Sequence, residues 1–315
     1  MAPAEKWTAD QLPNLTGRTA IVTGANSGLG LATARELAAH GAEVTLAVRD
    51  PDRGEKAAES IIAAHPDAQL DVSPLDLADL HSVSAFASTW STTHPSGLDL
   101  LINNAGVMAI PRQLTADGFE RQFGTNHLGH FALTGLLIPA LVARPRSRVV
   151  TVSSGAHRFG RINFDDLMGE RRYQAWRAYG QSKLANLLFT SELQRRLDLG
   201  GVAVLAMAAH PGYAATNLQA VGPSMRGQRW AMGAVELGNR LFSQSAEMGA
   251  LPVLYAATAP GLPGDTFVGP DGLFEQRGYP RAVDRSKAAK NTADAARLWT
   301  VSEQLTGVTY PLDGV

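Results

Sequence analysis

The sequence predicts an α/β fold in which a single, doubly wound parallel sheet is covered by helices on both faces. Two observations support this prediction. Short β-branched or apolar runs alternate with longer segments of helical periodicity along most of the 315 residues. The first run breaks into glycines and continues directly as a helical pattern, which is typical of a tight strand-to-helix turn. Strict alternation indicates parallel strands, because a parallel pair needs a crossover connection.

Residues 1–17 are predicted to be a polar lead-in, with an anchor at Trp7. One domain is expected over 18–315, since no internal repeat or low-complexity linker interrupts it. The predicted strands are 19–23, 44–48, 70–72, 98–102, 148–152 and 202–207. The predicted helices are 31–40, 52–64, 79–91, 117–143, 173–198, 245–258 and 288–305. The Gly- and Pro-rich stretch 260–287 is predicted to be irregular. The interrupted apolar stretch 217–243 fits either a lid over a ligand or an ordinary surface subdomain.

Composition limits the kinds of partner. The chain has 28 basic and 29 acidic residues and 18% charged residues, so no strong field attracts nucleic acid or an anionic membrane. No apolar stretch reaches the ~18 residues of a membrane span, and the first residues lack a signal-peptide core. We therefore expect a cytoplasmic protein with a small-molecule partner, and a homo-oligomer stays open. The absence of cysteine excludes disulfides, thiolate metal sites and a cysteine nucleophile, and we expect no bound metal.

The glycine-rich turn is the first candidate binding site. Gly24, Gly28 and Gly30 stand where the backbone turns sharply, and the N–H groups of a helix N-terminus point at whatever comes close. A phosphate is the usual occupant, and a second strand near 43–48 completes the βαβ context of a dinucleotide site. The other turn residues that we expect to contact a cofactor are Asn26, Ser27 and Leu29. A simpler alternative is that the glycines serve only the turn itself.

Residues after the second and third strands bear on the choice of nucleotide. Arg49 can form a fork on the 2′-phosphate of NADP(H), whereas an acidic residue would accept from the 2′-hydroxyl of NAD(H). Because Arg49 precedes Asp50, we favour NADP(H); alternatively, Arg49 is solvated and Asp50 binds the ribose. Asp76 and Leu77 are predicted to approach the adenine, although an Asp at such a place is also a common helix N-cap.

Polar side chains follow two further strands, at the edge where α/β sheets bind ligands. Asn103 offers donors and acceptors after the fourth strand, and Ala105 and Gly106 allow close approach. Asn126 stands among apolar neighbours in the next helix and needs a partner there. The fifth strand ends in two serines, of which Ser154 is the second, and so places hydroxyl groups at the same edge.

Tyr179 and Lys183 are four residues apart in a predicted helix and share one face. A cation ~4 Å from a phenol contributes roughly 4 kcal/mol at an effective dielectric constant of ~20, and one pKa unit is about 1.4 kcal/mol. We therefore expect Lys183 to lower the pKa of Tyr179 toward neutrality. This spacing occurs by chance on many helices. It indicates a catalytic pair here because the glycine turn and the polar strand ends precede it in the chain.

Together these residues resemble the motifs of the short-chain dehydrogenase/reductase family over about residues 18–305. The glycine turn is similar to that family's cofactor turn, and residues 103–106 are similar to its central-strand motif. The resemblance implies a Rossmann fold, a nicotinamide cofactor and the catalytic set Asn126, Ser154, Tyr179 and Lys183. It also implies Ser154 rather than Ser153. By the same resemblance, the cofactor would be contacted by Tyr179, Lys183, Pro211, Gly212 and Thr216.

The resemblance also implies roles. Tyr179 would exchange a proton with the substrate oxygen while the nicotinamide exchanges a hydride with the carbon. Ser154 would hydrogen-bond the carbonyl and Lys183 would bind the nicotinamide ribose. Asn126 would hold a water that links Lys183 to solvent.

Within the family the motifs are similar to those of the retinol-dehydrogenase-like branch. They are also close to light-dependent protochlorophyllide reductases, but those use an active-site cysteine, which this chain lacks. The membrane anchor of several animal retinol dehydrogenases is also not evident, which argues against a retinoid. We expect an NADP(H)-dependent oxidoreductase that acts on a lipophilic carbonyl or alcohol. A noncatalytic NADP(H)-binding regulator is the alternative, and a Rossmann methyltransferase would leave Tyr179 and Lys183 unexplained.

Overall fold

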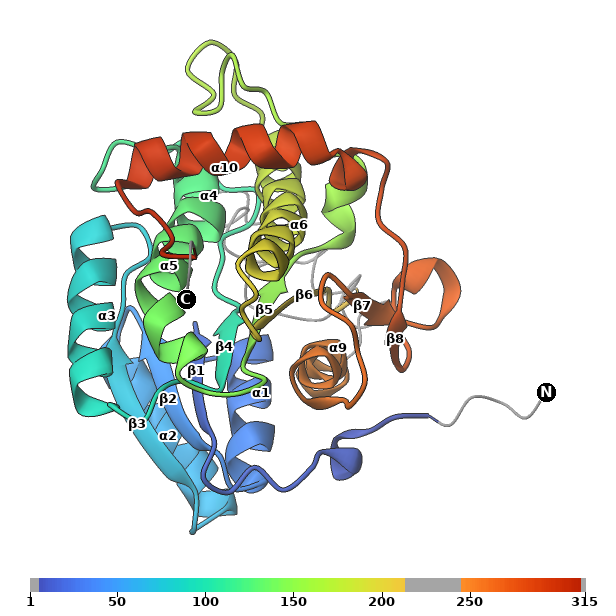
Figure 1. Cartoon of the computed structure of the whole chain (residues 1–315). Helices are drawn as coiled ribbons and strands as arrows, with labels where there is room; N and C mark the ends of the chain where they lie inside the picture. Colours follow the sequence, from blue (N-terminus) through green and yellow to red (C-terminus); the bar gives the residue numbers. More distant parts are fainter. Residues whose placement is uncertain (1–5, 213–244, 313–315) are drawn as a thin grey trace, which may run out of the picture.

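A computed structural model describes residues 6–212 and 245–312, and within these residues the chain forms one eight-stranded sheet (Figure 1). The strand order is β3-β2-β1-β4-β5-β6-β7-β8, in which the first seven are parallel and β8 is antiparallel to β7. The strands are β1 (Thr19–Thr23), β2 (Glu43–Val48), β3 (Gln69–Pro74), β4 (Leu100–Asn103), β5 (Arg148–Val152), β6 (Leu205–Ala209), β7 (Phe267–Pro270) and β8 (Pro280–Ala282).

Helices cover both faces of this sheet. The longer helices are α1 (Gly28–Ala39), α2 (Pro51–Ala64), α3 (Leu80–Thr93), α5 (Gly129–Val142), α6 (Ala175–Leu199), α9 (Ala246–Thr258) and α10 (Thr292–Thr306). The helices α1, α2 and α9 share one apolar core with the sheet, and α3, α5 and α6 share the other. Ile21 of β1 belongs to one core and its neighbours Ala20 and Val22 to the other, because successive side chains of a strand point to opposite faces. The predicted doubly wound fold is therefore confirmed.

The centre of the sheet defines where a ligand can lie. β1 pairs with β2 on one side and with β4 on the other, so the crossover that follows β1 and the crossover that follows β4 run in opposite directions. In α/β sheets this reversal opens a crevice outside the carboxyl ends of the two central strands. The glycine turn follows β1, and Asn103 and Asn104 stand at the end of β4, so both predicted ligand-binding segments meet at that crevice.

The carboxyl-terminal part of the sheet departs from the prediction. The stretch 260–287 is not wholly irregular, since it contains β7 and β8. β7 has only four residues and ends in Gly269 and Pro270, so its sequence resembles a loop, and it is stabilised by pairing with β6. The sixth strand also lies later than predicted, at Leu205–Ala209 instead of 202–207.

The predicted helix 117–143 begins later, with α4 (Arg121–Phe123). Leu114 and Glu120 form a bridge around a turn at Gly118, whose φ of +83° is left-handed. The Glu120 carboxylate then accepts from the N–H groups of Gln122 and Phe123 and caps the helix. The helix next passes through a π-turn, η2 (Gly124–Leu128), before α5. Apolar periodicity extends over the preceding turn, which is why the sequence prediction began too early.

The lead-in packs on the domain where it is described. Trp7 contacts Tyr255 of α9 edge-on, with ring centroids 5.2 Å apart, and Leu12 and Leu15 are buried in the same core as α1. The predicted lid at 217–243 lies outside the described residues.

Candidate active site

Three glycines shape the turn between β1 and α1. Gly24 and Gly28 have left-handed backbones, with φ of +67° and +54°. A Cβ atom at Gly30 would collide with the Gly24 carbonyl oxygen and would lie 2.6 Å from Asn104 Nδ2, so no side chain fits there. The N-cap of α1, Ser27, makes no side-chain capping hydrogen bond. Its hydroxyl therefore leaves the first N–H groups of α1 available for an anion, and the turn fits the phosphates of a dinucleotide.

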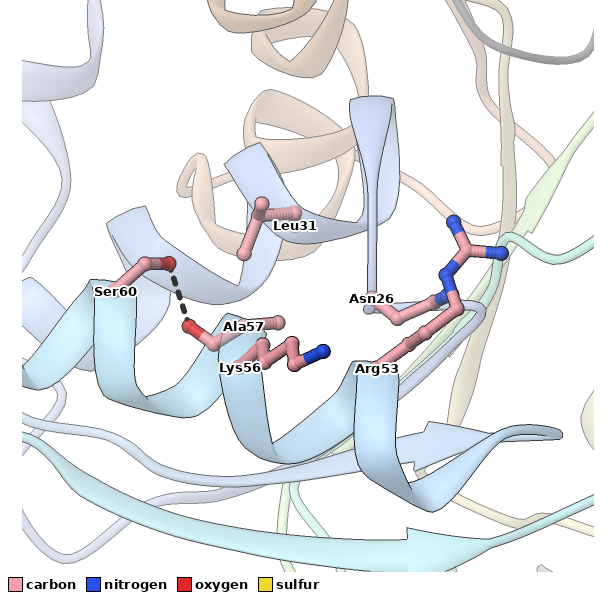
Figure 2. Close-up of a pocket in the computed structure, with 6 residues that line it drawn as sticks. All are labelled: Asn26, Leu31, Arg53, Lys56, Ala57 and Ser60. Atoms are coloured by element: carbon pink, nitrogen blue, oxygen red, sulfur yellow. Dashed lines mark hydrogen bonds between the residues drawn. The ribbon is translucent and has the colours of Figure 1, made fainter.

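A pocket of about 230 Å³ opens beside the turn, between α1 and α2 (Figure 2). Its lining is Asn26, Leu31, Arg53, Lys56, Ala57 and Ser60. Arg53 and Lys56 bring two cationic side chains to this pocket, and the Arg53 side chain lies beside Asn26 in Figure 2. Sequence reasoning missed both cations. Their three-residue spacing at the start of the second helix was the available signal, because it places them on one face.

The pair Arg49 and Asp50 lies where β2 ends, and both residues are exposed. Asp50 is the N-cap of α2, and its Oδ1 accepts from the backbone N–H of Arg53 at 3.2 Å. This carboxylate already has a structural partner. The cap uses one acceptor site of a carboxylate that has several, so it gives Asp50 a structural role without excluding it from ribose binding.

Three other predicted cofactor contacts have structural partners in the fold. The Leu29 side chain is buried in the core, so only its backbone faces the turn. Asp76 Oδ1 accepts from the N–H of Ala78 at 2.9 Å, which shapes the bend after β3. Leu77 is buried, and a Cβ atom at Gly129 would collide with its carbonyl oxygen, so Leu77 packs closely on the start of α5.

The ends of β1 and β4 are joined through one hydroxyl group. Thr23 Oγ1 accepts from the backbone N–H groups of Asn104 and Ala105, both at 2.9 Å, and Asn104 Nδ2 donates to the Thr23 carbonyl at 2.8 Å. His130 Nδ1 donates to the Asn126 carbonyl at 3.1 Å, and Nε2 lies 2.9 Å from Thr23 Oγ1. Burial lowers the pKa of His130 to about 4, so it is a neutral bridge at physiological pH. Sequence reasoning missed His130, which has no distinctive spacing, whereas Asn104 belongs to the predicted motif at residues 103–106.

Asn103 carries a buried acceptor at the end of β4. Its Nδ2 donates to the Thr134 hydroxyl at 2.9 Å, while its Oδ1 is buried without a hydrogen-bond partner among the described residues. Buried polar atoms in folded proteins nearly always have a partner. This acceptor therefore fits a site that takes a polar ligand at the crevice.

Asn126 lies in the π-turn η2, a deviation from α-helix that is frequent at functional sites. Its Nδ2 donates to the Val107 carbonyl and to the Ser182 hydroxyl, both at 2.9 Å, and its Oδ1 accepts from the Val107 N–H. A Cβ atom at Gly106 would lie 3.0 Å from Asn126 Oδ1 and 3.6 Å from Lys183 Nζ. Asn126 and Lys183 thus both border the narrow space that Gly106 leaves open.

The four expected catalytic residues meet at this edge. Lys183 Nζ donates to the Val152 carbonyl at 3.0 Å and lies 5.8 Å from the centroid of the Tyr179 ring. The Ser154 hydroxyl hydrogen-bonds Tyr179. The Ser153 hydroxyl instead donates to the Lys183 carbonyl at 2.8 Å. Ser154 is thus the serine whose hydroxyl lies at Tyr179, and the hydroxyl of Ser153 is bound to the backbone.

Burial controls the titration of the pair on α6. It raises the pKa of Tyr179 to about 12, while the hydrogen bond from Ser154 acts in the opposite direction. It lowers the pKa of Lys183 to about 8. The expectation that Lys183 brings the Tyr179 pKa close to neutrality is therefore wrong for this structure, because desolvation of the buried phenol dominates its pKa and Lys183 Nζ lies 5.8 Å from the ring centroid.

β6 leads directly into the Pro-Gly segment. Gly212 follows Pro211 with φ of +66°, a left-handed backbone that favours glycine. A Cβ atom at Gly212 would collide with the Gln276 carbonyl oxygen, so the two backbones touch. Thr216, the remaining predicted contact of this segment, lies outside the described residues.

Comparison with known proteins identifies the family of the chain. The family model described as short chain dehydrogenase matches residues 18–226. The chain therefore belongs to the short-chain dehydrogenase/reductase family of oxidoreductases, as its motifs predicted.

Within the family, the similar proteins include retinol dehydrogenases. Retinol dehydrogenase 11 of Mus musculus is 44% identical over 299 residues, which cover 95% of this chain and 89% of the relative. Retinol dehydrogenase 13 of Homo sapiens is 42% identical and covers 94% of this chain and 87% of the relative. The predicted likeness to the retinol-dehydrogenase-like branch is thus confirmed.

Solved structures agree with the fold. An uncharacterised protein from Mycobacterium paratuberculosis has 51% identity and a TM-score of 0.81, covering 98% of this chain and 100% of that chain. The active-site complex of Pseudomonas aeruginosa RhlG with NADP has 25% identity and a TM-score of 0.63, covering 83% and 98%. Among the described residues of the present chain, none of the helices has the length and apolar character needed to cross a membrane.

Proposed function

We propose that this chain is an NADP(H)-dependent oxidoreductase that interconverts a lipophilic carbonyl and its alcohol. One observation carries the proposal: Tyr179 is buried, hydrogen-bonded by Ser154 and adjacent to the ammonium group of Lys183. A phenol in this setting is placed to exchange a proton with a substrate oxygen. A purely regulatory nucleotide-binding protein has no need of this cluster, so the geometry favours the enzyme over the noncatalytic alternative.

The residues of the crevice would hold a nicotinamide dinucleotide along the ends of the central strands. The N–H groups at the start of α1 would bind its phosphates. Lys183 would bind the nicotinamide ribose, and Pro211 and Gly212 would face the nicotinamide. When bound, the nicotinamide supplies or accepts the hydride.

The preference for NADP(H) is supported by charge. Arg49 follows β2, and Arg53 and Lys56 line the adjoining pocket, so three cationic side chains lie near the expected place of the adenosine ribose. A 2′-phosphate would be attracted by all three, whereas a 2′-hydroxyl would not. One structural neighbour, RhlG, was solved with NADP. The sequence prediction rested on Arg49 alone, and the pocket adds two further residues to it.

The proton transfer follows from the titration of the site. With a pKa of about 12, Tyr179 is protonated at neutral pH and can donate its hydroxyl proton to a carbonyl oxygen. Ser154 would hydrogen-bond the same oxygen and stabilise the charge that develops on it. Lys183, fixed by the Val152 carbonyl, would stabilise the phenolate left behind. Asn126 would hold a water between Lys183 and solvent, so that the proton returns to Tyr179.

A lipophilic substrate is supported by the surroundings of Tyr179 and by the relatives. Trp176 packs edge-on against the Tyr179 ring, with centroids 6.1 Å apart, and is half exposed. Phe159, also half exposed, packs against Gly180. The relatives named above act on retinol according to their names, and retinol is a lipophilic alcohol. A lid at 217–243, a homo-oligomer and a cytoplasmic location stay predictions from the sequence.

The proposal is tested by substrate screening with both nucleotides. NADPH and NADH oxidation would be measured against aldehydes, ketones and quinones of graded apolar length, with all-trans-retinal included. We expect turnover with NADPH to rise with the apolar surface of the carbonyl compound and to exceed turnover with NADH. NADPH binding without oxidation by any compound of the panel, and without reduction of NADP by the matching alcohols, would favour the noncatalytic alternative.

A further inference from the structure

A short turn after β7 has an unusual backbone. In η4 (Leu273–Glu275), Phe274 and Glu275 have φ of +54° and +56°, so two consecutive non-glycine residues are left-handed. Such a conformation is unfavourable for residues with a Cβ atom and persists only where the surroundings hold it. The contacts of Glu275 provide that support, and they lead into the candidate active site.

The Glu275 carboxylate joins two loops that flank the site. The Arg158 guanidinium donates to both of its oxygens at 2.9 Å, from the 3-10 turn η3 (Gly155–Arg158) that follows Ser154. His210 Nε2 lies 3.2 Å from Glu275 Oε2, from the end of β6. These hydrogen bonds, with that of His210 the largest cause, lower the pKa of Glu275 to about 2, so it is ionised at neutral pH.

The two ring nitrogens of His210 have distinct partners. The N–H of Gly212 donates to His210 Nδ1 at 3.3 Å, so Nδ1 is the acceptor and Nε2 carries the proton that is donated to Glu275. His210 is 1% exposed, and a Cβ atom at Gly269 would collide with its ring, so the imidazole cannot move aside. The Gln276 carbonyl packs against Gly212 from the same turn.

We propose that Glu275 is a positioning residue which, through His210, fixes the Pro211–Gly212 turn against the nicotinamide end of the nucleotide. The inference rests on the proposed function. A positioning role differs from a general stabilising role, because the contacts from Glu275 through His210 lead only to the Pro211–Gly212 turn. The adenosine end of the nucleotide would lie at the opposite side of the crevice, among Asn26, Arg53 and Lys56, and it has no part in these contacts.

The test compares a whole nucleotide with its adenosine half. Dissociation constants for NADPH and for 2′,5′-ADP would be measured on wild type, Glu275→Ala and Glu275→Gln, together with kcat and KM for NADPH. Glu275→Ala removes the acceptor for His210, so we expect NADPH binding to weaken about tenfold while 2′,5′-ADP binding stays within about twofold. Glu275→Gln keeps one oxygen that can accept from His210, and we expect it to restore most of the NADPH affinity.

Two further variants sharpen the test. Arg158→Met removes the half-exposed partner of Glu275 but leaves the contact with His210, so it is the matched control and should change NADPH binding by less than about threefold. His210→Val loses both hydrogen bonds and needs no more volume than the imidazole, so it should reproduce the selective loss and replaces Glu275→Ala if that variant does not fold.

The outcomes separate this inference from the proposed function. If Glu275→Ala weakened NADPH binding and 2′,5′-ADP binding equally, or changed neither, the positioning role would be overturned. The proposed function would still hold in that case, provided that wild type reduces carbonyl compounds. A wild type that binds 2′,5′-ADP but not NADPH would contradict the proposed function, and the role of Glu275 with it.

Discussion

The two halves of the candidate site are built in different ways. The turn half, comprising β1, residues 24–27 and the start of α1, is made mainly of backbone, and its shape depends on glycines that no side chain can replace. The tyrosine half, comprising Ser154, Tyr179, Lys183 and Asn126, is made of side chains from α6, from η2 and from the N-cap of η3 after β5. Backbone sites leave a local pattern in the sequence, whereas side-chain networks depend on elements brought together only by folding.

This difference separates binding from chemistry. A change in the tyrosine half should alter turnover more than nucleotide affinity, and a change in the turn half should do the reverse. Variants at Tyr179 and Gly30 test this division directly, and variants at Lys183 and at the cations beside the turn then test what each half contributes, from the largest expected effect to the smallest.

Tyr179→Phe should have the largest effect. It removes only the phenolic oxygen, so packing and the turn half remain, and NADPH should bind nearly as in wild type. General acid catalysis typically supplies 10²- to 10⁴-fold, so kcat for carbonyl reduction should fall at least about 100-fold. Steady-state kinetics and NADPH fluorescence titration measure the two effects separately. A variant within about tenfold of wild-type turnover would refute Tyr179 as the proton donor.

Gly30→Ala should have the opposite effect. Its Cβ atom would collide with the Gly24 carbonyl oxygen, so the turn must shift at a cost of about 2 kcal/mol. The dissociation constant of NADPH should therefore rise roughly 30-fold, while kcat at saturating NADPH changes little. Isothermal titration calorimetry measures the affinity, and thermal unfolding shows whether the domain stays folded. A Gly30→Ala protein with wild-type affinity would mean that the turn does not bind the phosphates.

The sequence predicted the turn half almost completely, because glycine is the residue that a left-handed or crowded backbone requires. It also predicted the strand ends at Asn103 and Ser154, since strands and helices alternate regularly. It could not predict the π-turn at Asn126, because apolar periodicity does not distinguish a π-turn from an α-helix.

The burial of the tyrosine half could not be predicted from the sequence either. The rise in the Tyr179 pKa depends on burial by residues far apart in the chain, which no spacing reveals. The contacts of the Glu275 carboxylate were missed for the same reason, because its partners Arg158 and His210 are 117 and 65 residues away in the chain. Its host segment was predicted as irregular.

The protonation of Lys183 can be measured without nucleotide, from the pH dependence of the free energy of unfolding. Its pKa is about 8 in the folded chain, against a model-compound value of 10.5. Between these values the unfolded chain holds more protons, so folding stability rises as pH increases from 8. The free energy of unfolding of wild type relative to Lys183→Met should increase by about 2 kcal/mol between pH 8 and 9.5. Urea unfolding at both pH values measures it, and a constant difference would mean that Lys183 is not desolvated.

The smallest effect concerns the edge of the turn half, where side chains and not backbone select the nucleotide. Arg49→Ala and Arg53→Ala should each remove one charge-assisted contact to the 2′-phosphate and raise the NADPH dissociation constant about tenfold. NADH binding, the matched control, should barely change. Lys56→Ala should have a smaller effect, because an ammonium group lacks the bidentate fork of arginine. Equal weakening of NADPH and NADH would assign these cations to the adenosine or pyrophosphate instead. An effect of Arg53 alone would show that the pocket, and not the strand end at Arg49, carries the selectivity that the sequence assigned to Arg49.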